Sequence, residues 1–203
     1  MKGLRYLALG DSYTIGEGVE PHECFPHQLA ARLRGEGFLL DDPEIIARTG
    51  WTTDELRAGI QARAPRGPYD LVTLLIGVNN QYRGRDVENY RVEFVDLVER
   101  AIVFAGNRPA RVVVLSIPDW GVTPFAAGRA NISAEIDAFN AVNRAETLRL
   151  GAQYLDITRA ARQARHDATL IAGDGLHPSP KMYRAWVEQL VPYVLELAHK
   201  ASM

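Results

Sequence analysis

Short apolar runs alternate along the chain with longer segments of helical periodicity. Two of the four or five runs are nearly continuous in Val, Leu and Ile, and the full set covers residues 5–9, 44–47, 71–76, 112–117 and 153–157. Strands of this composition are buried on both faces, as in a parallel sheet covered by helices. The pattern predicts an α/β fold with a central parallel sheet of about five strands.

The segments between the runs carry the end signals of helices. Thr52 and Glu55 fit a capping box, which predicts a helix from there to about Arg63. Asp86 precedes a single apolar stripe of helical spacing and is expected to cap the helix that carries it. Because strands alternate with helices, the connections are expected to be right-handed crossovers, which build a doubly wound sheet.

Two more helices are expected in the second half of the chain. Asn131 or Ser133 opens the first, and Ser179 followed by Pro180 fits a cap and first helical position for the last. Pro192 is expected to kink or end that last helix, since proline lacks the backbone N–H that continues it.

Size and charge narrow the class of protein. With 203 residues, 47% of them apolar, the chain suits one domain spanning residues 1–203. A formal net charge of -2 offers no basic excess to neutralise phosphates, so no nucleic-acid partner is expected. No stretch is apolar enough over the length needed to span a bilayer. The oligomeric state is not readable from the pattern.

The number of cysteines indicates the redox state of the cellular compartment in which the protein is expected. Cys24 is the only cysteine, so no disulfide within the chain is possible, and it is expected to be a small, partly buried apolar residue. The first apolar run is too short for a signal peptide and leads straight into a polar turn. Both features predict a cytoplasmic protein.

Polar residues and glycines gather where strands of the predicted sheet end. Three strands run into residues 10–13, 48–51 and 77–80, and residues 174–178 directly precede the last helix. In open parallel sheets, ligands bind beyond the carboxyl ends of the strands. We therefore expect these four segments to meet at one edge of the sheet.

The segments contain the parts that acyl transfer needs. A serine hydroxyl, here Ser12, is a weak nucleophile and requires a base, for which His177 is the candidate. Asp174, three residues before the histidine, can fix its tautomer and stabilise the imidazolium. The backbone N–H groups of Ser12 and Gly50 and the amide of Asn79 can donate to an oxyanion.

Taken together, these blocks resemble the GDSL, or SGNH, hydrolase family. The order is the same: a Gly-Asp-Ser block, a glycine block, a Gly-x-Asn-Asp block and an Asp-x-x-His block, spread over nearly the whole chain. The resemblance implies a flavodoxin-like three-layer α/β/α fold and a serine esterase, lipase-like, that forms an acyl-enzyme. It also implies the same catalytic triad and oxyanion hole. One position departs from the family pattern, since Asn80 stands where the family usually has Asp. This difference affects the local hydrogen bonds that hold Asn79.

The substrate is expected to be a small ester. Four aromatic residues follow predicted strand ends, and one or two of them are expected to line the acyl or alcohol pocket: Trp51, Tyr82, Trp120 and Phe125. The loops are short, which favours short acyl or acetyl esters. No cofactor is expected. No metal is expected either, because cysteine pairs and a His-Glu-x-x-His motif are missing.

Other interpretations of these residues are open. Gly-Asp-Ser by itself is a turn composition, and Ser12 gains weight only beside His177 and Asp174. The same residues would serve an acyltransferase with an alcohol acceptor. Gly16 and Gly18 allow a nucleotide-binding module of the same fold, although the Gly-x-Gly-x-x-Gly pattern is incomplete at Pro21.

Overall fold

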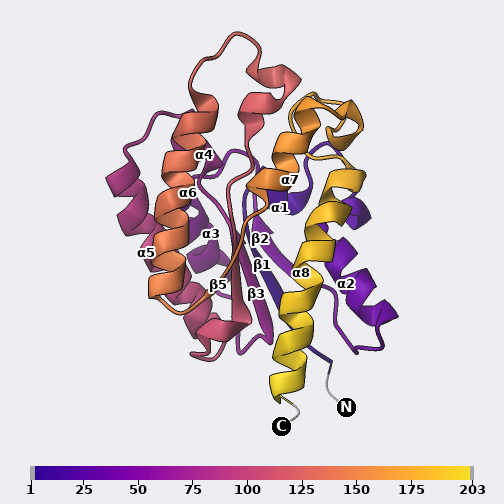
Figure 1. Cartoon of the computed structure of the whole chain (residues 1–203). Helices are drawn as coiled ribbons and strands as arrows, with labels where there is room; N and C mark the ends of the chain where they lie inside the picture. Colours follow the sequence, from indigo (N-terminus) through magenta and orange to yellow (C-terminus); the bar gives the residue numbers. More distant parts are fainter. Residues whose placement is uncertain (1–2, 202–203) are drawn as a thin grey trace.

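The computed structural model of the chain describes residues 3–201, without the side chains of residues 198–201. Its centre is a parallel sheet of five strands in the order β2-β1-β3-β4-β5 (Figure 1). The strands are β1 (Tyr6–Gly10), β2 (Glu44–Ala47), β3 (Leu71–Leu75), β4 (Val112–Leu115) and β5 (Gln153–Leu155). Every residue of β1, β3 and β4 is buried, as two covered faces require. The predicted sheet is confirmed.

Helices cover both faces of the sheet, which gives the expected three layers (Figure 1). On one face α2 packs against α8, and on the other α5 packs against α3 and α6. The helices are α1 (Ser12–Ile15), α2 (Phe25–Gly35), α3 (Thr53–Arg63), α4 (Val78–Tyr82), α5 (Val87–Phe104), α6 (Ile132–Arg149), α7 (Thr158–Arg162) and α8 (Pro180–Ala201). Short 3-10 helices are η1 (Pro21–Glu23), η2 (Pro109–Arg111), η3 (Trp120–Val122), η4 (Pro124–Ala126), η5 (Gln163–Arg165) and η6 (Ala168–Leu170).

The predicted helix starts are confirmed. Thr52 and Glu55 form the capping box of α3, and the Asp86 carboxylate accepts the first free N–H groups of α5. Ser179 Oγ accepts the N–H of Met182 at 3.3 Å, at the start of α8. Asn131 precedes α6, but with a left-handed backbone and no hydrogen bond from its side chain.

The structure adds one helix to the predicted pattern and excludes one of the two outcomes expected at Pro192, the end of the last helix. The pattern does not predict α2, because this helix begins after Cys24, whose side chain forms no capping hydrogen bond. Pro192 does not end α8, which continues to Ala201. The buried Val191 and Val194 on either side of the proline keep this helix packed on the sheet, so packing outweighs the lost backbone hydrogen bond.

The strand order determines where a ligand-binding site can form. The chain passes from β1 to β2 on one side and then returns to β3 on the other, so the order reverses between β1 and β3. Ligands of open α/β sheets bind in the crevice at such a reversal. Gly10 at the end of β1 is level with Ala47 of β2 and Leu75 of β3. The segments after these three strands therefore start side by side.

Candidate active site

Ser12 is the first residue of α1, separated from the end of β1 only by Asp11. The carboxylate of Asp11 caps this short helix and accepts the N–H of Tyr13 at 3.1 Å. A helix leaves its first N–H groups without a partner inside the helix, so the N–H of Ser12 is available to a ligand. The serine is 5% exposed, so solvent reaches it only through the cavity described below.

Asp11 itself is completely buried, and its Oδ2 atom has no hydrogen-bond partner within the described residues. Burial raises the pKa of this carboxyl to about 8, although the N–H of Tyr13 acts in the opposite direction. Burial therefore favours the neutral form of the residue that caps α1.

Asp174 and His177 form a tight pair in the loop before α8. Asp174 Oδ2 lies 2.5 Å from His177 Nδ1, and Oδ1 accepts the backbone N–H groups of Leu176 and His177 at 2.9 and 3.0 Å. Partial burial raises the pKa of Asp174, but these hydrogen bonds outweigh it, and the pKa lies below its ordinary value. The aspartate is thus an ionised acceptor that fixes both the turn and the imidazole ring.

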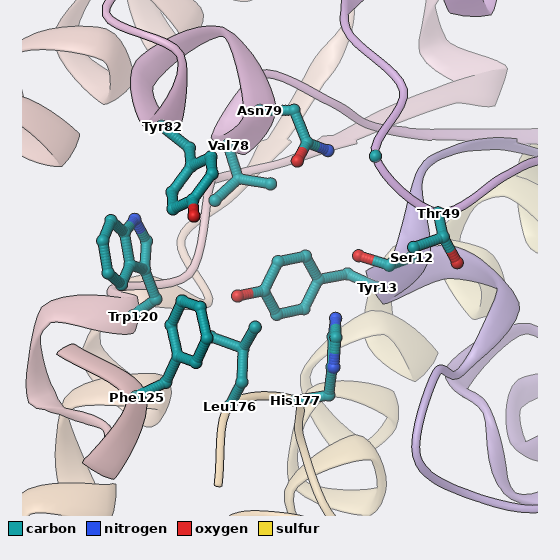
Figure 2. Close-up of a pocket in the computed structure, with 11 residues that line it drawn as sticks. Ser12, Tyr13, Thr49, Val78, Asn79, Tyr82, Trp120, Phe125, Leu176 and His177 are labelled. Carbon is teal, nitrogen blue, oxygen red and sulfur yellow. The ribbon is translucent and has the colours of Figure 1, made fainter. Parts of the chain in front are cut away.

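One cavity of about 200 Å³ brings these groups together. Ser12 and His177 line the same end of it, and the ring of His177 extends toward Ser12 (Figure 2). The ring of Tyr13 lies 5.3 Å from the His177 ring, measured between centroids, and packs against it. His177 is 8% exposed, so its ring is shielded from bulk water.

The two remaining blocks also contribute to this cavity. Gly50, after β2, and Asn79, in α4, both line it, and Asn79 lies across the cavity from His177 (Figure 2). Asn79 Nδ2 donates to the carbonyl of Trp51 at 2.9 Å, which orients the amide and leaves its second N–H free. Gly50 has a φ of +81°, a left-handed conformation that L side chains rarely adopt. The glycine is therefore required by the turn that brings the backbone to the serine.

Asn80 connects the third block to α3. Its Oδ1 accepts the N–H of Thr53 at 3.1 Å, and its Nδ2 donates to the hydroxyl of Thr53 at 2.7 Å. That hydroxyl in turn donates to the carboxylate of Glu93. An aspartate here would accept the same N–H but would have no donor for the hydroxyl. The departure at position 80 thus fits a hydrogen-bond chain that ends on Glu93.

Three of the four aromatic candidates line the cavity at the end away from Ser12: Tyr82, Trp120 and Phe125 (Figure 2). Trp120 is fixed by a hydrogen bond from Nε1 to Oε1 of Gln81 at 2.8 Å. Trp51 does not line the cavity. Its ring lies against α3, where a Cβ on Gly59 would come within 2.2 Å of it, and only its carbonyl serves the site, through Asn79.

The sequence pattern missed several cavity residues and one support. Tyr13, Thr49, Val78 and Leu176 also line the cavity, next to the residues that the blocks identified. Arg83 donates from Nη2 to the carbonyl of Gly50 at 2.6 Å and stabilises the glycine turn. No local signal marks Arg83, because its target lies on a different strand end and becomes its neighbour only in the folded sheet.

The glycines after β1 have a packing role. A Cβ on Gly18 would lie 3.0 Å from Asp174 Oδ2, and a Cβ on Gly16 would lie 2.5 Å from the Cβ of Cys24. The loop therefore passes close to an ionised carboxylate, which repels phosphate. This arrangement disfavours the nucleotide-binding interpretation.

Other candidate chemistry does not assemble. Within residues 3–201, no cluster of three or more His, Cys, Asp or Glu side chains is arranged to hold a metal ion. His166 is exposed, as its charged surroundings predict, whereas the side chain of His199 lies outside the described residues. None of the described helices is long and apolar enough to cross a membrane.

Comparison with solved structures shows that this fold recurs. TesA superposes with a TM-score of 0.73 at 20% identity, over 95% of this chain and 99% of that one. Axe2, an acetylxylan esterase from Geobacillus stearothermophilus, superposes with a TM-score of 0.70 at 16% identity, over 95% of this chain and 94% of that one. The psychrotrophic esterase EstA from Pseudoalteromonas sp. superposes with a TM-score of 0.71 at 16% identity, over 96% of this chain and 98% of that one. At these identities the likeness establishes the fold alone.

The family is established by sequence. A comparison with curated protein sequences gives no match. The model of the GDSL-like lipase/acylhydrolase family, in contrast, matches residues 8–185, which include Ser12, Gly50, Asn79, Asp174 and His177. The chain belongs to the GDSL-like lipase/acylhydrolase family and is an ester-hydrolysing serine hydrolase.

Proposed function

We propose that the protein hydrolyses short-chain carboxylic or thio- esters through an acyl-enzyme on Ser12. One observation carries the proposal: Ser12 shares a cavity with a histidine whose Nδ1 lies 2.5 Å from the Asp174 carboxylate. A carboxylate at Nδ1 leaves Nε2 of the neutral His177 ring as the acceptor for the serine proton. The pair thus supplies a base of the tautomer that serine catalysis needs.

Acylation starts when Ser12 Oγ attacks the carbonyl carbon and its proton passes to His177 Nε2. The carbonyl oxygen becomes an oxyanion, which accepts from the N–H groups of Ser12 and Gly50 and from the free N–H of Asn79. The ester bond then breaks, and the leaving alcohol takes the proton from His177. The acyl group stays on Ser12.

Deacylation repeats the sequence with water. His177 takes a proton from water while the water oxygen attacks the acyl carbon, and a second oxyanion forms against the same donors. Its collapse releases the acid and returns the proton to Ser12. The mechanism consumes one water per ester and needs no cofactor.

The size of the cavity supports short acyl groups. Its volume of about 200 Å³ lies below the roughly 300–1,000 Å³ typical of pockets for drug-sized ligands. Apolar side chains such as Val78 and Leu176 contribute much of the wall, which suits a short hydrocarbon chain. In a series of 4-nitrophenyl esters from acetate to dodecanoate, kcat/KM should peak at the short end, and a peak at ten or more carbons would overturn this preference.

Replacement of the nucleophile tests the reaction itself. Ser12→Ala should reduce the hydrolysis of 4-nitrophenyl acetate by at least about 1,000-fold in kcat, because only the oxyanion donors and substrate binding remain. Ser133→Ala, at a half-buried serine in the first turn of α6 that does not line the cavity, is the matched control and should keep full activity. Full activity of Ser12→Ala would rule out the proposal, and mass spectrometry after a fluorophosphonate probe should place the adduct on Ser12.

A further inference from the structure

A cation lies over the aromatic end of the cavity. The guanidinium carbon of Arg129 is 5.1 Å from the ring centroid of Tyr82, 5.4 Å from that of Trp120 and 5.6 Å from that of Phe125. These rings form the end of the cavity away from Ser12 (Figure 2). All three distances fall within the range of cation–π contact, which holds the guanidinium at this end.

This charge lacks a counter-charge. Nearby arginines are paired, Arg83 with Glu55 at 3.3 Å and Arg85 with Asp54 at 2.6 Å. Among residues 3–201, no carboxylate forms an ion pair with Arg129, which is exposed. The residues that line the cavity include no Asp or Glu. An anionic group at this end of the cavity would therefore find the Arg129 cation next to it and no carboxylate among the lining residues.

The geometry of the contact leaves the donors of Arg129 free. Contact with the electron-rich rings does not use the N–H groups of a guanidinium in conventional hydrogen bonds, so these donors stay available to another partner. No hydrogen bond from these groups occurs within the described residues, and only the backbone N–H of Arg129 is used, toward Ala126. A planar fork of free donors matches a carboxylate, which it can bind through two parallel hydrogen bonds.

The cavity thus extends from Ser12 to an aromatic end, and the free guanidinium of Arg129 lies against the three rings of that end, beside the residues that line the cavity. We propose that the preferred substrates are esters that carry a carboxylate on the far side of a short hydrocarbon spacer, and that Arg129 is the specificity-determining residue that binds it. This inference rests on the proposed function of Ser12 and deepens it by naming the substrate class.

The opposite preference is the main alternative. Three aromatic rings around one cation also resemble a cage for a quaternary ammonium. Here Arg129 already occupies the position over the rings, and a second cation would be repelled. A choline ester should therefore be a poor substrate.

The test compares charged and neutral esters of equal length. On the acyl side, the substrates are mono-4-nitrophenyl adipate and suberate, each with the ester whose far carboxylate is replaced by a carboxamide. On the alcohol side, they are 4-(carboxymethyl)phenyl acetate and its amide. The ratio of kcat/KM for the carboxylate over the amide should be about 2 to 5 for one side, since an exposed charge pair is weak. Salt at 0.5 M should lower the ratio.

Variants assign the effect to Arg129. The ratio should fall to about 1 in Arg129→Gln, fall below 1 in Arg129→Glu and be partly kept in Arg129→Lys. Arg66→Gln removes the same charge from the loop before β3, at the opposite edge of the sheet, and should leave the ratio and the activity unchanged. Circular dichroism and thermal unfolding establish that each variant is folded.

The outcomes separate this inference from the proposed function. A ratio of 1 or less on both sides in the wild-type enzyme, or a ratio that Arg129→Gln does not change, overturns the role of Arg129. Faster hydrolysis of butyrylthiocholine than of the adipate ester overturns it in favour of the cage. Hydrolysis that persists in Ser12→Ala instead defeats the proposed function.

Discussion

The Nδ1 atom of His177 lies 2.5 Å from Oδ2 of Asp174, three residues earlier in the same loop. The other oxygen of that carboxylate holds the backbone of the loop through the N–H groups of Leu176 and His177. One side chain therefore fixes both the path of the chain and the orientation of the imidazole. The hydrogen bonds to the loop depend on the shape of this side chain, whereas the interaction with the imidazole depends on its charge. A substitution that keeps the shape can therefore test the charge alone.

Asp174→Asn keeps the shape and removes the charge. We expect kcat to fall by about 10²- to 10⁴-fold with little change in KM, because a carboxamide does not stabilise the imidazolium and can select the wrong tautomer. The measurement is steady-state hydrolysis of 4-nitrophenyl acetate. Asp42→Asn, which disturbs only an exposed pair with Arg34, is the control and should keep wild-type kinetics. Wild-type kcat in Asp174→Asn would contradict the role of the carboxylate.

Asn79 is expected to act only after attack, when the oxyanion forms. Asn79→Ala should lower kcat by about 100- to 1,000-fold, the usual cost of one oxyanion donor. KM should change little, since the ground-state carbonyl gains less from the donor. Asn89→Ala, on the exposed side of α5, provides the comparison. A variant that raises KM with unchanged kcat would show that Asn79 binds substrate and does not stabilise the oxyanion.

Asn80 should resist replacement by the residue that its family usually carries. In Asn80→Asp, two carboxylates, at 80 and at Glu93, would compete for the one hydroxyl proton of Thr53. We expect the free energy of unfolding to fall by about 1–3 kcal/mol, the cost of a buried polar group left unpaired. The companion change Glu93→Gln should recover part of it in the double variant. Urea denaturation measures both, and additive effects would exclude the coupling.

Asp11 predicts a pH dependence of stability. Its pKa is about 8 in the folded chain and about 3.8 when unfolded, so folding takes up a proton between these values. The free energy of unfolding should therefore decrease as pH rises from about 4 to 8, by up to about 1.4 kcal/mol per pH unit from this group. Asp11→Asn removes this contribution. A variant whose stability falls as steeply as that of the wild type over this range would refute it.

The dependence of activity on pH follows from the neutral base. Since His177 accepts the serine proton only when it is unprotonated, kcat/KM should rise with pH through one ionisation and then level off. The lowered pKa of Asp174 keeps its carboxylate charged throughout this rise. Initial rates from pH 5 to 9, with correction for buffer hydrolysis, test the rise. A flat profile with chemistry rate-limiting would contradict the role of His177.

Local sequence determined the elements and much of the site. A short run rich in Val and Leu, such as that at Leu71–Leu75, favours a strand between two layers, and the capping box at Thr52 begins α3 because its partner Glu55 is close in sequence. The pairing of Asp174 with His177 could also be predicted from the sequence, since a separation of three residues suffices for a turn that joins their side chains. In each case the interacting groups are close neighbours along the chain, so the local sequence pattern is enough to predict their interaction.

Tertiary structure decided whatever depends on contacts between distant segments. It placed Trp51 against Gly59 and away from the cavity, and it brought Arg83 to the carbonyl of Gly50. It also set Arg129 over the three rings of the cavity end. The direction of a side chain depends on the packing of elements far apart in sequence, and a charge is paired or free according to the neighbours that the fold supplies. The sequence therefore determined the acyl-transfer chemistry, and the fold determined what surrounds it.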